Sequence, residues 1–231
     1  MCPTNQTTKQ RFSSVIKRIE AACANYQRDP HHIRLLAVSK TKPVEQIRAL
    51  IDLGQRSFGE NYVDEAVAKA TELKHLDLSW HFIGPIQSNK TRLLAEHFDW
   101  VESVDRLKIA RRLADQRSRE QSPLNVLIQV DLDHETQKAG CDPDEVDALA
   151  DFIASRSTLR LRGLMAIPAP REALADQRAV FARLRALFDR LARSHRSVDT
   201  LSAGMSGDLE AAIAEGSTEI RVGTDLFGPR G

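Results

Sequence analysis

The feature that most constrains the fold of this chain is a regular alternation of short apolar segments with longer amphipathic ones. Residues 34–39 form an apolar run rich in strand formers. After Pro43, the residues Ile47, Leu50 and Ile51 recur at the three- and four-residue spacing of a helix. The same unit then repeats along the chain. The predicted strands are residues 34–39, 57–60, 80–84, 100–103, 125–130, 161–167, 199–202 and 219–223.

Helical patterns separate these strands. They lie at about residues 43–54, 62–73, 89–97, 105–119 and 143–154, in a long segment that ends near residue 195, and at 207–214. Strands that alternate with helices form a parallel sheet, and eight is the number of strands that closes into a (β/α)8 TIM barrel. A doubly wound open sheet is the alternative, because closure is not visible in a sequence. We predict one α/β domain over residues 1–231, with an extra helix within residues 1–28 packed on the barrel.

The composition excludes several classes of protein. The 33 Lys and Arg residues nearly balance the 32 Asp and Glu residues, so the net charge of +1 would attract neither nucleic acid nor an anionic membrane. No secretory signal or membrane-spanning run is present in the sequence. The three cysteines have wide, irregular spacing, and the spacings typical of zinc and calcium sites are missing. We expect a cytoplasmic protein with a small-molecule partner and no metal.

Lys40 is the first candidate for chemistry. Binding groups of a parallel barrel lie where its strands end, and Lys40 directly follows the first predicted strand. Burial lowers the pKa of a lysine, and a neutral lysine amine can form a Schiff base. The nearby Lys42 would further favour the neutral amine. A rim lysine with its ammonium group in water is the alternative.

A phosphate site is the second candidate. Residues 202–206 (SAGMS) and 221–224 (RVGT) follow the seventh and eighth predicted strands, where such barrels commonly hold a phosphate. The small residues would let backbone amides approach a ligand, and Ser206 is expected at a helix N-terminus, whose dipole favours a dianion. A serine that caps a helix without any ligand would give the same pattern.

Three further residues are better explained without catalysis. A single histidine within a strand, such as His81, is more often a hydrogen-bonded core residue than a ligand. Cys141 has no activating neighbour apart from Lys138, so a structural thiol is expected. Lys138 itself lies in a polar loop, where a solvated charge is favoured, although a part in the chemistry of the site is the alternative.

Six motifs, each at the end of a predicted strand, resemble the pyridoxal phosphate homeostasis proteins. The fold of these proteins is similar to the barrel domain of bacterial alanine racemase. The motifs occur in order and span most of the chain. They are residues 36–43 (LAVSKTKP), 58–62 (FGENY), 80–90 (WHFIGPIQSNK), 163–168 (GLMAIP), 201–206 (LSAGMS) and 221–228 (RVGTDLFG).

The resemblance implies a protein that binds pyridoxal 5′-phosphate (PLP) and supplies it for intracellular vitamin B6 homeostasis. Lys40 would form the Schiff base and Arg221 would face the pyridine nitrogen. The implied phosphate-binding residues are Ser206, Gly223 and Thr224, and those that line the pocket are Asn61, His81 and Met165. Ala203, Gly207 and Asp225 stand at places where the family varies or often has another residue, which affects only the fine geometry of the phosphate loop.

Two observations favour a carrier over an enzyme. Arginine only donates hydrogen bonds, so Arg221 would keep the pyridine nitrogen unprotonated and the ring a poor electron sink. An amino-acid racemase, which is the alternative, also needs an acid/base on the second face of the cofactor. In the racemases a tyrosine of a C-terminal β domain supplies it across a dimer. This chain ends at Gly231, and its tyrosines are Tyr26 and Tyr62. We expect a non-enzymatic monomer that meets PLP-dependent apoenzymes transiently. A barrel lyase or isomerase that acts on a phosphorylated metabolite is a third hypothesis.

Overall fold

The computed structural model describes residues 3–133 and 139–228, and it shows a closed barrel of eight parallel strands in chain order. The first and last strands pair in register from Arg34 with Glu219 to Ala37 with Val222, so the barrel prediction is confirmed and the open sheet is excluded. The strands are β1 (Arg34–Val38), β2 (Ser57–Glu60), β3 (Ser79–Phe82), β4 (Trp100–Val104), β5 (Leu124–Gln129), β6 (Leu159–Met165), β7 (Thr200–Ser202) and β8 (Glu219–Val222).

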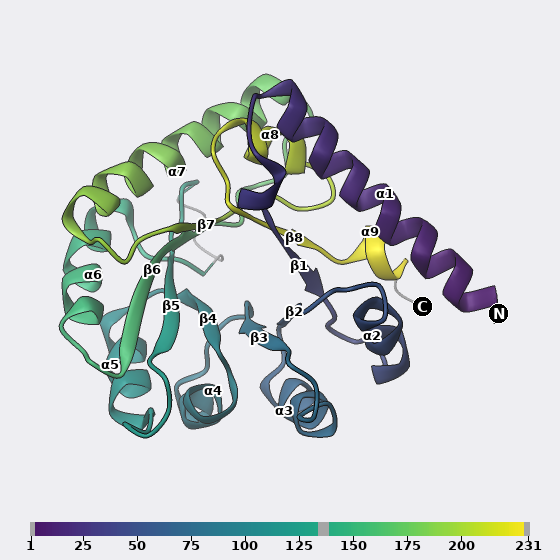
Figure 1. Cartoon of the computed structure of the whole chain (residues 1–231). Coiled ribbons are helices and arrows are strands. Elements are labelled where there is room, and N and C mark those ends of the chain that lie inside the picture. The colour runs from purple at the N-terminus through teal and green to yellow at the C-terminus, as the bar shows by residue number, and fades with distance from the viewer. Residues whose placement is uncertain (1–2, 134–138, 229–231) are drawn as a thin grey trace.

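Helices surround the strands (Figure 1). They are α1 (Pro3–Asn25), α2 (Val44–Ile51), α3 (Val63–Glu72), α4 (Thr91–His97), α5 (Leu107–Gln116), α6 (Val146–Ala154), α7 (Leu174–Ser194), α8 (Leu209–Ala214) and α9 (Thr224–Phe227). Short 3-10 turns at Pro30–His32, Ser88–Lys90 and Pro143–Glu145 precede β1, α4 and α6. The sequence did not predict the four-residue helix α9. None of the helices among the described residues is both long and apolar enough to span a membrane.

The leading helix α1 packs against α8 and α9 on the outside of the barrel (Figure 1). Its buried face consists of Val15, Ile19, Ala22 and Cys23, which recur at three- and four-residue steps. The predicted amphipathic helix is therefore present. It also lies beside the two segments that follow β7 and β8.

The prediction that Ser206 stands at a helix N-terminus is wrong. The side chain of Asp208 accepts a hydrogen bond from the backbone amide of Met205 at 2.6 Å, which closes a turn over residues 205–208. Because Asp208 itself has a non-helical backbone, with φ of −146°, α8 begins only at Leu209. Ser206 lies in the turn before the helix.

The helix predicted at 105–119 is shorter than expected at both ends. Arg106 has an extended backbone, so α5 starts at Leu107. At the other end, the guanidinium of Arg117 turns away to donate to the carbonyls of Phe98 and Ser122 at 3.0–3.1 Å, and Arg117 leaves the helical conformation. Lys138 lies outside the described residues, so its predicted role is not addressed by the structure.

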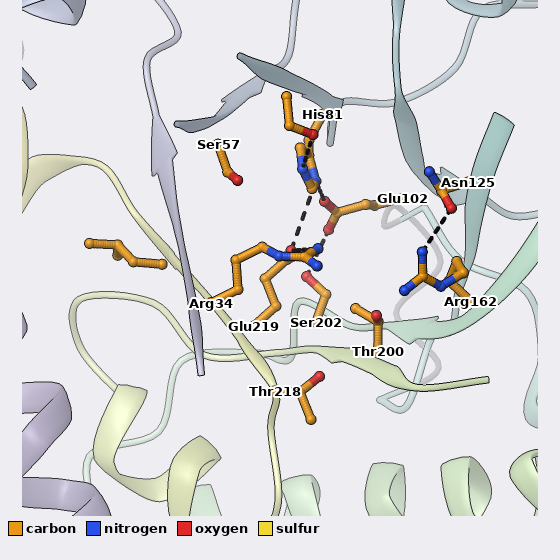
Figure 2. Close-up of polar contacts among 12 residues, drawn as sticks. Arg34, Ser57, His81, Glu102, Asn125, Arg162, Thr200, Ser202, Thr218 and Glu219 are labelled. Atoms are coloured by element: carbon orange, nitrogen blue, oxygen red, sulfur yellow. Dashed lines mark hydrogen bonds and ion pairs between the residues drawn. The ribbon is translucent and has the colours of Figure 1, made fainter. Parts of the chain in front are cut away.

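The interior of the barrel is more polar than the branched apolar cores that dominate this fold. His81, Glu102 and Glu219 have no exposed surface, and Arg221 is 3% exposed. Figure 2 shows several of these side chains pointing toward one another between the strands. The apolar core lies instead between the strands and the helices, where Phe58, Phe82 and Ile109 are fully buried. Charged groups are thus held directly below the strand ends where a ligand site is expected.

Candidate functional site

Lys40 stands in a tight turn directly after β1. The flanking Thr41 has a φ of +60°, which is unfavourable for a β-branched residue. Three hydrogen bonds hold this turn: the Thr41 amide donates to Oε1 of Glu65 at 2.7 Å, the Lys42 amide donates to the Ser39 carbonyl at 3.0 Å, and the Ser39 hydroxyl donates to Oε1 of Glu60 at 2.6 Å. The backbone on both sides of Lys40 is therefore fixed.

A buried lysine, Lys69 of α3, connects these contacts. Its Nζ atom donates to the carbonyl of Ser39 at 2.8 Å, to Oε1 of Glu60 at 2.7 Å and to Oε1 of Glu65 at 2.6 Å. An ammonium group has three hydrogens, so this one is fully used. Burial raises the pKa of Glu60, and the hydrogen bond from Lys69 opposes this rise. Bonds between charged partners are the stronger ones, so Lys69 ties the Lys40 turn to β2 and α3.

The sequence did not point to Lys69 or Glu65 as residues of the site. Their i,i+4 spacing on a predicted helix was the available signal, but such pairs usually stabilise only the helix surface. That this pair faces inward against the Lys40 turn follows from the tertiary fold.

Arg18 of α1 joins the two loops that were expected to bind phosphate. Its guanidinium donates to the carbonyl of Ser206 at 2.9 Å, to Oε1 of Glu210 at 2.9 Å and to Oδ2 of Asp225 at 2.7 Å. Asp225, one of the residues at which the family pattern varies, is thereby part of a structural contact. The leading helix holds the segment after β7 and the segment after β8 in one arrangement.

The loop after β7 contains two backbone amides without a partner among the described residues. Within the part of the chain that the structure describes, the backbone amides of Ser206 and Gly207 have no hydrogen-bond partner. A side chain at Gly207 would meet no atom within 4 Å, whereas a Cβ at Gly204, which has a φ of +95°, would lie 2.6 Å from Cβ of Ala212. Gly204 is thus required by packing, and Gly207 is not. At Gly223 a Cβ would make only an ordinary contact with Val38 at 3.4 Å.

Asn61 follows β2 and offers an unused polar atom. Its Oδ1 is buried and has no hydrogen-bond partner among the described residues. The turn after β3 packs closely against it, because a Cβ at Gly84 would lie 2.4 Å from the carbonyl oxygen of Asn61. Buried polar atoms are rarely left unpaired, so Asn61 is a candidate for ligand contact.

Arg221 reaches the upper part of the barrel interior from β8. Its Nη2 donates to the carbonyl of Ala166 at 2.8 Å, and its Nη1 donates to the hydroxyl of Ser202 at 2.7 Å. That hydroxyl donates in turn to Oε2 of Glu102 at 2.7 Å. Burial lowers the pKa of Arg221, and the charges of Glu102 and Glu219 oppose this shift. An arginine remains protonated in this setting, so Arg221 is a fixed donor.

His81 and Met165 lie inside the barrel with no exposed surface. The His81 ring stacks on Trp100 at a centroid distance of 5.1 Å, and its Nδ1 lies 2.6 Å from Oε1 of Glu102. Burial lowers the pKa of His81 to about 4, so the ring is neutral. Met165 packs with Trp100 and Leu127. The reading of His81 as a hydrogen-bonded core residue is confirmed.

One cluster was not visible in the sequence. Potential ligand atoms of His81, Glu102 and Glu219 lie within 4.8 Å of one another, although the residues come from three different strands. The two carboxyl groups also face the guanidinium groups of Arg34 and Arg221. A divalent cation would therefore leave a buried excess of positive charge, which is costly, and we assign no metal here.

The thiol of Cys141 is unreactive, as the sequence predicted. Burial, reinforced by the charge of Glu145, raises its pKa to about 12, so the nucleophilic thiolate does not form at neutral pH. Burial also raises the pKa of Cys23.

Comparison with known proteins agrees with the motifs. The pattern of the alanine racemase N-terminal domain matches residues 15–231. The pyridoxal phosphate homeostasis protein of Pseudomonas aeruginosa is 54% identical over 224 residues, which are 97% of this chain and 96% of the relative. Its counterpart in Escherichia coli K12 is 52% identical, with 95% of each chain covered. The chain belongs to the pyridoxal phosphate homeostasis protein family.

Solved structures with a similar barrel include both similar and distant proteins. The structure of PipY from Synechococcus elongatus with PLP bound is 40% identical and superposes with a TM-score of 0.79 over 91% of this chain and 100% of that one. Alanine racemase from Corynebacterium glutamicum is 14% identical, with a TM-score of 0.67 over 98% of this chain and 61% of that one, which shows the shared fold alone. The family resemblance drawn from the six motifs is confirmed.

Proposed function

We propose that this protein binds PLP as a Schiff base on Lys40, and that it sequesters and supplies the cofactor for vitamin B6 homeostasis. The observation that carries the proposal is the placement of Lys40 and Arg221 at the ends of the paired strands β1 and β8, in a chain 40% identical to PipY, which has been solved with PLP. When bound, PLP supplies a reactive aldehyde and an electron-withdrawing ring.

The residues present fit this cofactor. The amine of Lys40 suits the aldehyde, and the donor groups of Arg221 suit an unprotonated pyridine nitrogen. The unpaired Oδ1 of Asn61 marks a buried polar position that a polar ligand would satisfy. We assign the phosphate to Ser206, Gly223 and Thr224, supported by the unpartnered amides of residues 206 and 207. His81 and Met165 would contribute from inside the barrel, below the ring.

Carriage rather than catalysis is supported by the same arginine. A ring whose nitrogen accepts from Arg221 is a weaker electron sink than one paired with a carboxylate, so bond breaking at an attached substrate is disfavoured. The curated relatives are also named for homeostasis. An amino-acid racemase is the alternative, and its support is the fold shared with alanine racemase. Transient contact with PLP-dependent apoenzymes, a monomeric state and a cytoplasmic location belong to the same proposal.

The deciding experiment is an absorption spectrum of the purified protein with PLP, followed by borohydride reduction and peptide mapping. We expect a Schiff-base band and a pyridoxyl group on Lys40. Lys40→Ala should abolish the band with an unchanged circular dichroism spectrum, and the neighbouring Lys42→Ala should retain it. A pyridoxyl group on another lysine, or an unchanged band in Lys40→Ala, would overturn the assignment.

The carrier role needs a second measurement. The loaded protein is mixed with a PLP-dependent apoenzyme, and the recovery of that enzyme's activity is compared with recovery from the same concentration of free PLP. Faster recovery from the loaded protein supports a donor. Recovery that is never faster than with free PLP would contradict the supply function and leave storage alone.

A further inference from the structure

Four ionisable side chains with almost no solvent contact meet inside the barrel, below the proposed cofactor site. They are His81 of β3, Glu102 of β4, and Glu219 and Arg221 of β8, and the half-buried Arg34 of β1 adjoins them. Figure 2 shows His81, Glu102, Glu219 and Arg34 directed toward a common point. Of this group, Arg221 and His81 have a role in the proposed function, whereas Glu102, Glu219 and Arg34 have none.

The two carboxyl groups of this cluster lie close together. Oxygen atoms of Glu102 and Glu219 lie within 4.8 Å of each other, and neither side chain has exposed surface. Two buried carboxylates at this distance repel each other when both are ionised, which favours a proton on one of them. The Oε1 atom of Glu219 is buried and receives no hydrogen bond from the described residues. An ionised oxygen would be left unpaired in that position, whereas a carboxylic acid would donate from there.

The surroundings place this proton on Glu219. Glu102 accepts hydrogen bonds from the Ser202 hydroxyl at 2.7 Å and from Nδ1 of His81 at 2.6 Å, and both of its oxygens are thereby used. Glu219 accepts one from Nη1 of Arg34 at 3.1 Å. Burial, followed by the charge of Glu102, raises the pKa of Glu219 to about 7. Burial raises the pKa of Glu102 as well, but the charge of Arg221 and the hydrogen bond from Ser202 oppose that rise, so we assign the proton to Glu219 within a pair that titrates as a unit.

We propose that Glu102 and Glu219 share one proton at neutral pH, and that this pair, through the Ser202 hydroxyl, positions Arg221 and makes its hold on the pyridine ring pH-dependent. Glu102 and Glu219 act as positioning residues, because neither touches the cofactor site directly. The link to PLP rests on the proposed function, whereas the shared proton does not.

The chain of contacts gives the direction of the effect. Arg221 binds Ser202, and Ser202 binds Glu102, so the charge on the carboxyl pair lies one hydroxyl away from the guanidinium. Loss of the shared proton adds a negative charge at this place. PLP carries a phosphate dianion, so the added charge weakens its binding as the pH rises.

Other charged groups face the pair and contribute to its titration. They are Arg34 from β1, the neutral His81 from β3 and Arg221 from β8. The charge of Asp99, just before β4, acts on His81, and the charge of Asp208, just before α8, acts on Arg221. Arg162 of β6 is engaged with Asp199 and Asn125. His81 is neutral near pH 7, because burial lowers its pKa to about 4.

The shared proton is tested by infrared spectroscopy of the cofactor-free protein between about pH 5 and about pH 9. We expect the carbonyl band of a buried carboxylic acid, which fades as the pH rises through the neutral range and is absent in Glu219→Gln. Asp77→Asn, at an exposed position, is the control and should retain the band. If the wild-type spectrum contains no such band, or if Glu219→Gln retains it, the proposal of a shared proton is wrong.

The effect on Arg221 is tested with PLP. The dissociation constant and the absorption maximum of the bound cofactor are measured over the same pH range. In the wild type we expect binding to weaken up to ~10-fold per pH unit over the interval in which the infrared band fades. Glu219→Gln, which keeps a neutral donor toward Glu102, should retain the tight binding seen at lower pH. Glu219→Leu and Ser202→Ala should bind weakly at every pH and shift the absorption maximum.

If Glu219 has a purely structural role, Glu219→Gln and Glu219→Leu will bind PLP alike, and the pH profile of binding will be the same as in the wild type. That result would contradict the proposal. If borohydride traps no cofactor on Lys40 of the wild type, the proposed function and the link to Arg221 both fail. The infrared band would still decide whether the proton is shared.

Discussion

The Nζ atom of Lys69 lies 2.7 Å from Oε1 of Glu60, and this ion pair is buried between α3 and β2. The same nitrogen donates to the carbonyl of Ser39, the residue before Lys40. Because the pair is removed from water, its contribution to stability depends on complete hydrogen bonding of both partners. Lys69 meets this condition with three acceptors, whereas Oε2 of Glu60 is buried and accepts no hydrogen bond from the described residues. The fully bonded ammonium group is therefore what holds the turn that contains Thr41 at positive φ.

Lys69→Met should destabilise the protein by ~3 to 5 kcal/mol, since it leaves the charge of Glu60 buried without its partner. It should also weaken the Schiff base on Lys40, because the turn loses its anchor. Urea unfolding measures the first effect and the absorption spectrum with PLP the second. The same substitution at Lys74, an exposed residue just beyond α3, is the matched control and should change neither. Wild-type stability in Lys69→Met would contradict the role of the pair.

Arg18→Met should reduce PLP affinity although Arg18 lies on the leading helix. The substitution releases the Ser206 carbonyl and Asp225, so the two proposed phosphate loops lose their common anchor. Because Arg18 is about one-third exposed, we expect a stability loss of only ~1 kcal/mol and an affinity loss of ~3- to 10-fold. Equilibrium titration with PLP measures the change. Arg190→Met, which breaks an exposed pair with Asp147, is the control.

Ser206→Ala isolates the side-chain part of the phosphate site. The carbonyl that Arg18 binds is retained, so the fold should persist, while the loss of one hydrogen bond to a charged acceptor should cost ~1.5 to 3 kcal/mol of PLP binding. A bulky residue at Gly223 should weaken binding more, because it blocks the approach of the backbone, and the ordinary contact with Val38 predicts little loss of stability. Unchanged affinity in Ser206→Ala would move the phosphate elsewhere.

The sequence predicted the barrel because periodicity is a local property of the chain. All eight strands were found, since each contains apolar residues and is bounded by turns and helices. Helix ends were less predictable, because contacts distant in sequence decide them: Arg117 leaves α5 for the carbonyls of Phe98 and Ser122. The turn at Ser206 escaped prediction for a similar reason, since Asp208 was not recognised as the residue that closes it.

The strand-end rule predicted Lys40, Asn61 and Arg221 at one end of the barrel, and all three lie at or near the carboxyl ends of β1, β2 and β8. Their roles toward a ligand stay a prediction. The rule did not reveal what lies beneath these residues. Glu102 and Glu219 are separated by more than a hundred residues and read as ordinary strand positions, and only barrel closure brings them together with His81. A sequence pattern predicts the rim of such a site better than its charged interior.

The stability of the protein should depend on pH through His81 and Glu219 in opposite directions. The pKa of His81 is lowered from 6.5 to about 4, so the unfolded chain binds this proton first and stability falls as the pH drops through that range. The pKa of Glu219 is raised from 4.5 to about 7, so the folded chain keeps a proton that the unfolded chain has lost, and stability falls as the pH rises through that range.

The two contributions to stability offset each other in the pH range where both groups titrate. The loss of stability should therefore be steeper below that range, where only His81 titrates, and above it, where only Glu219 titrates. Glu219→Gln cannot lose the proton. Its free energy of unfolding relative to the wild type should therefore increase between about pH 4.5 and about pH 7, by on the order of 1 to 3 kcal/mol. Urea titrations at several pH values measure this difference. A difference that is constant with pH would show that Glu219 does not titrate as described.

The last prediction concerns catalysis: the loaded protein should not racemise amino acids at an enzymatic rate. Inversion at the α-carbon needs an acid/base group on each face of the cofactor. Lys40 serves one face at most. Of the two tyrosines, Tyr26 lies after α1 with its ring against Arg178, and Tyr62 is 57% exposed at the end of β2. Neither tyrosine is held by the surrounding structure as a buried second base. Arg221 would also keep the pyridine ring a weak electron sink.

Incubation of the loaded protein with L- and D-alanine in deuterium oxide separates the outcomes, with α-deuteration and inversion followed together. Slow deuteration with retained configuration fits a single-faced site in which only Lys40 exchanges protons, and Lys40→Ala should abolish it. Inversion at ~1 to 1,000 per second would make the racemase alternative correct. In that case Tyr62→Phe shows whether the exposed tyrosine supplies the second proton: a large loss of inversion with retained deuteration would identify it as the missing acid/base group.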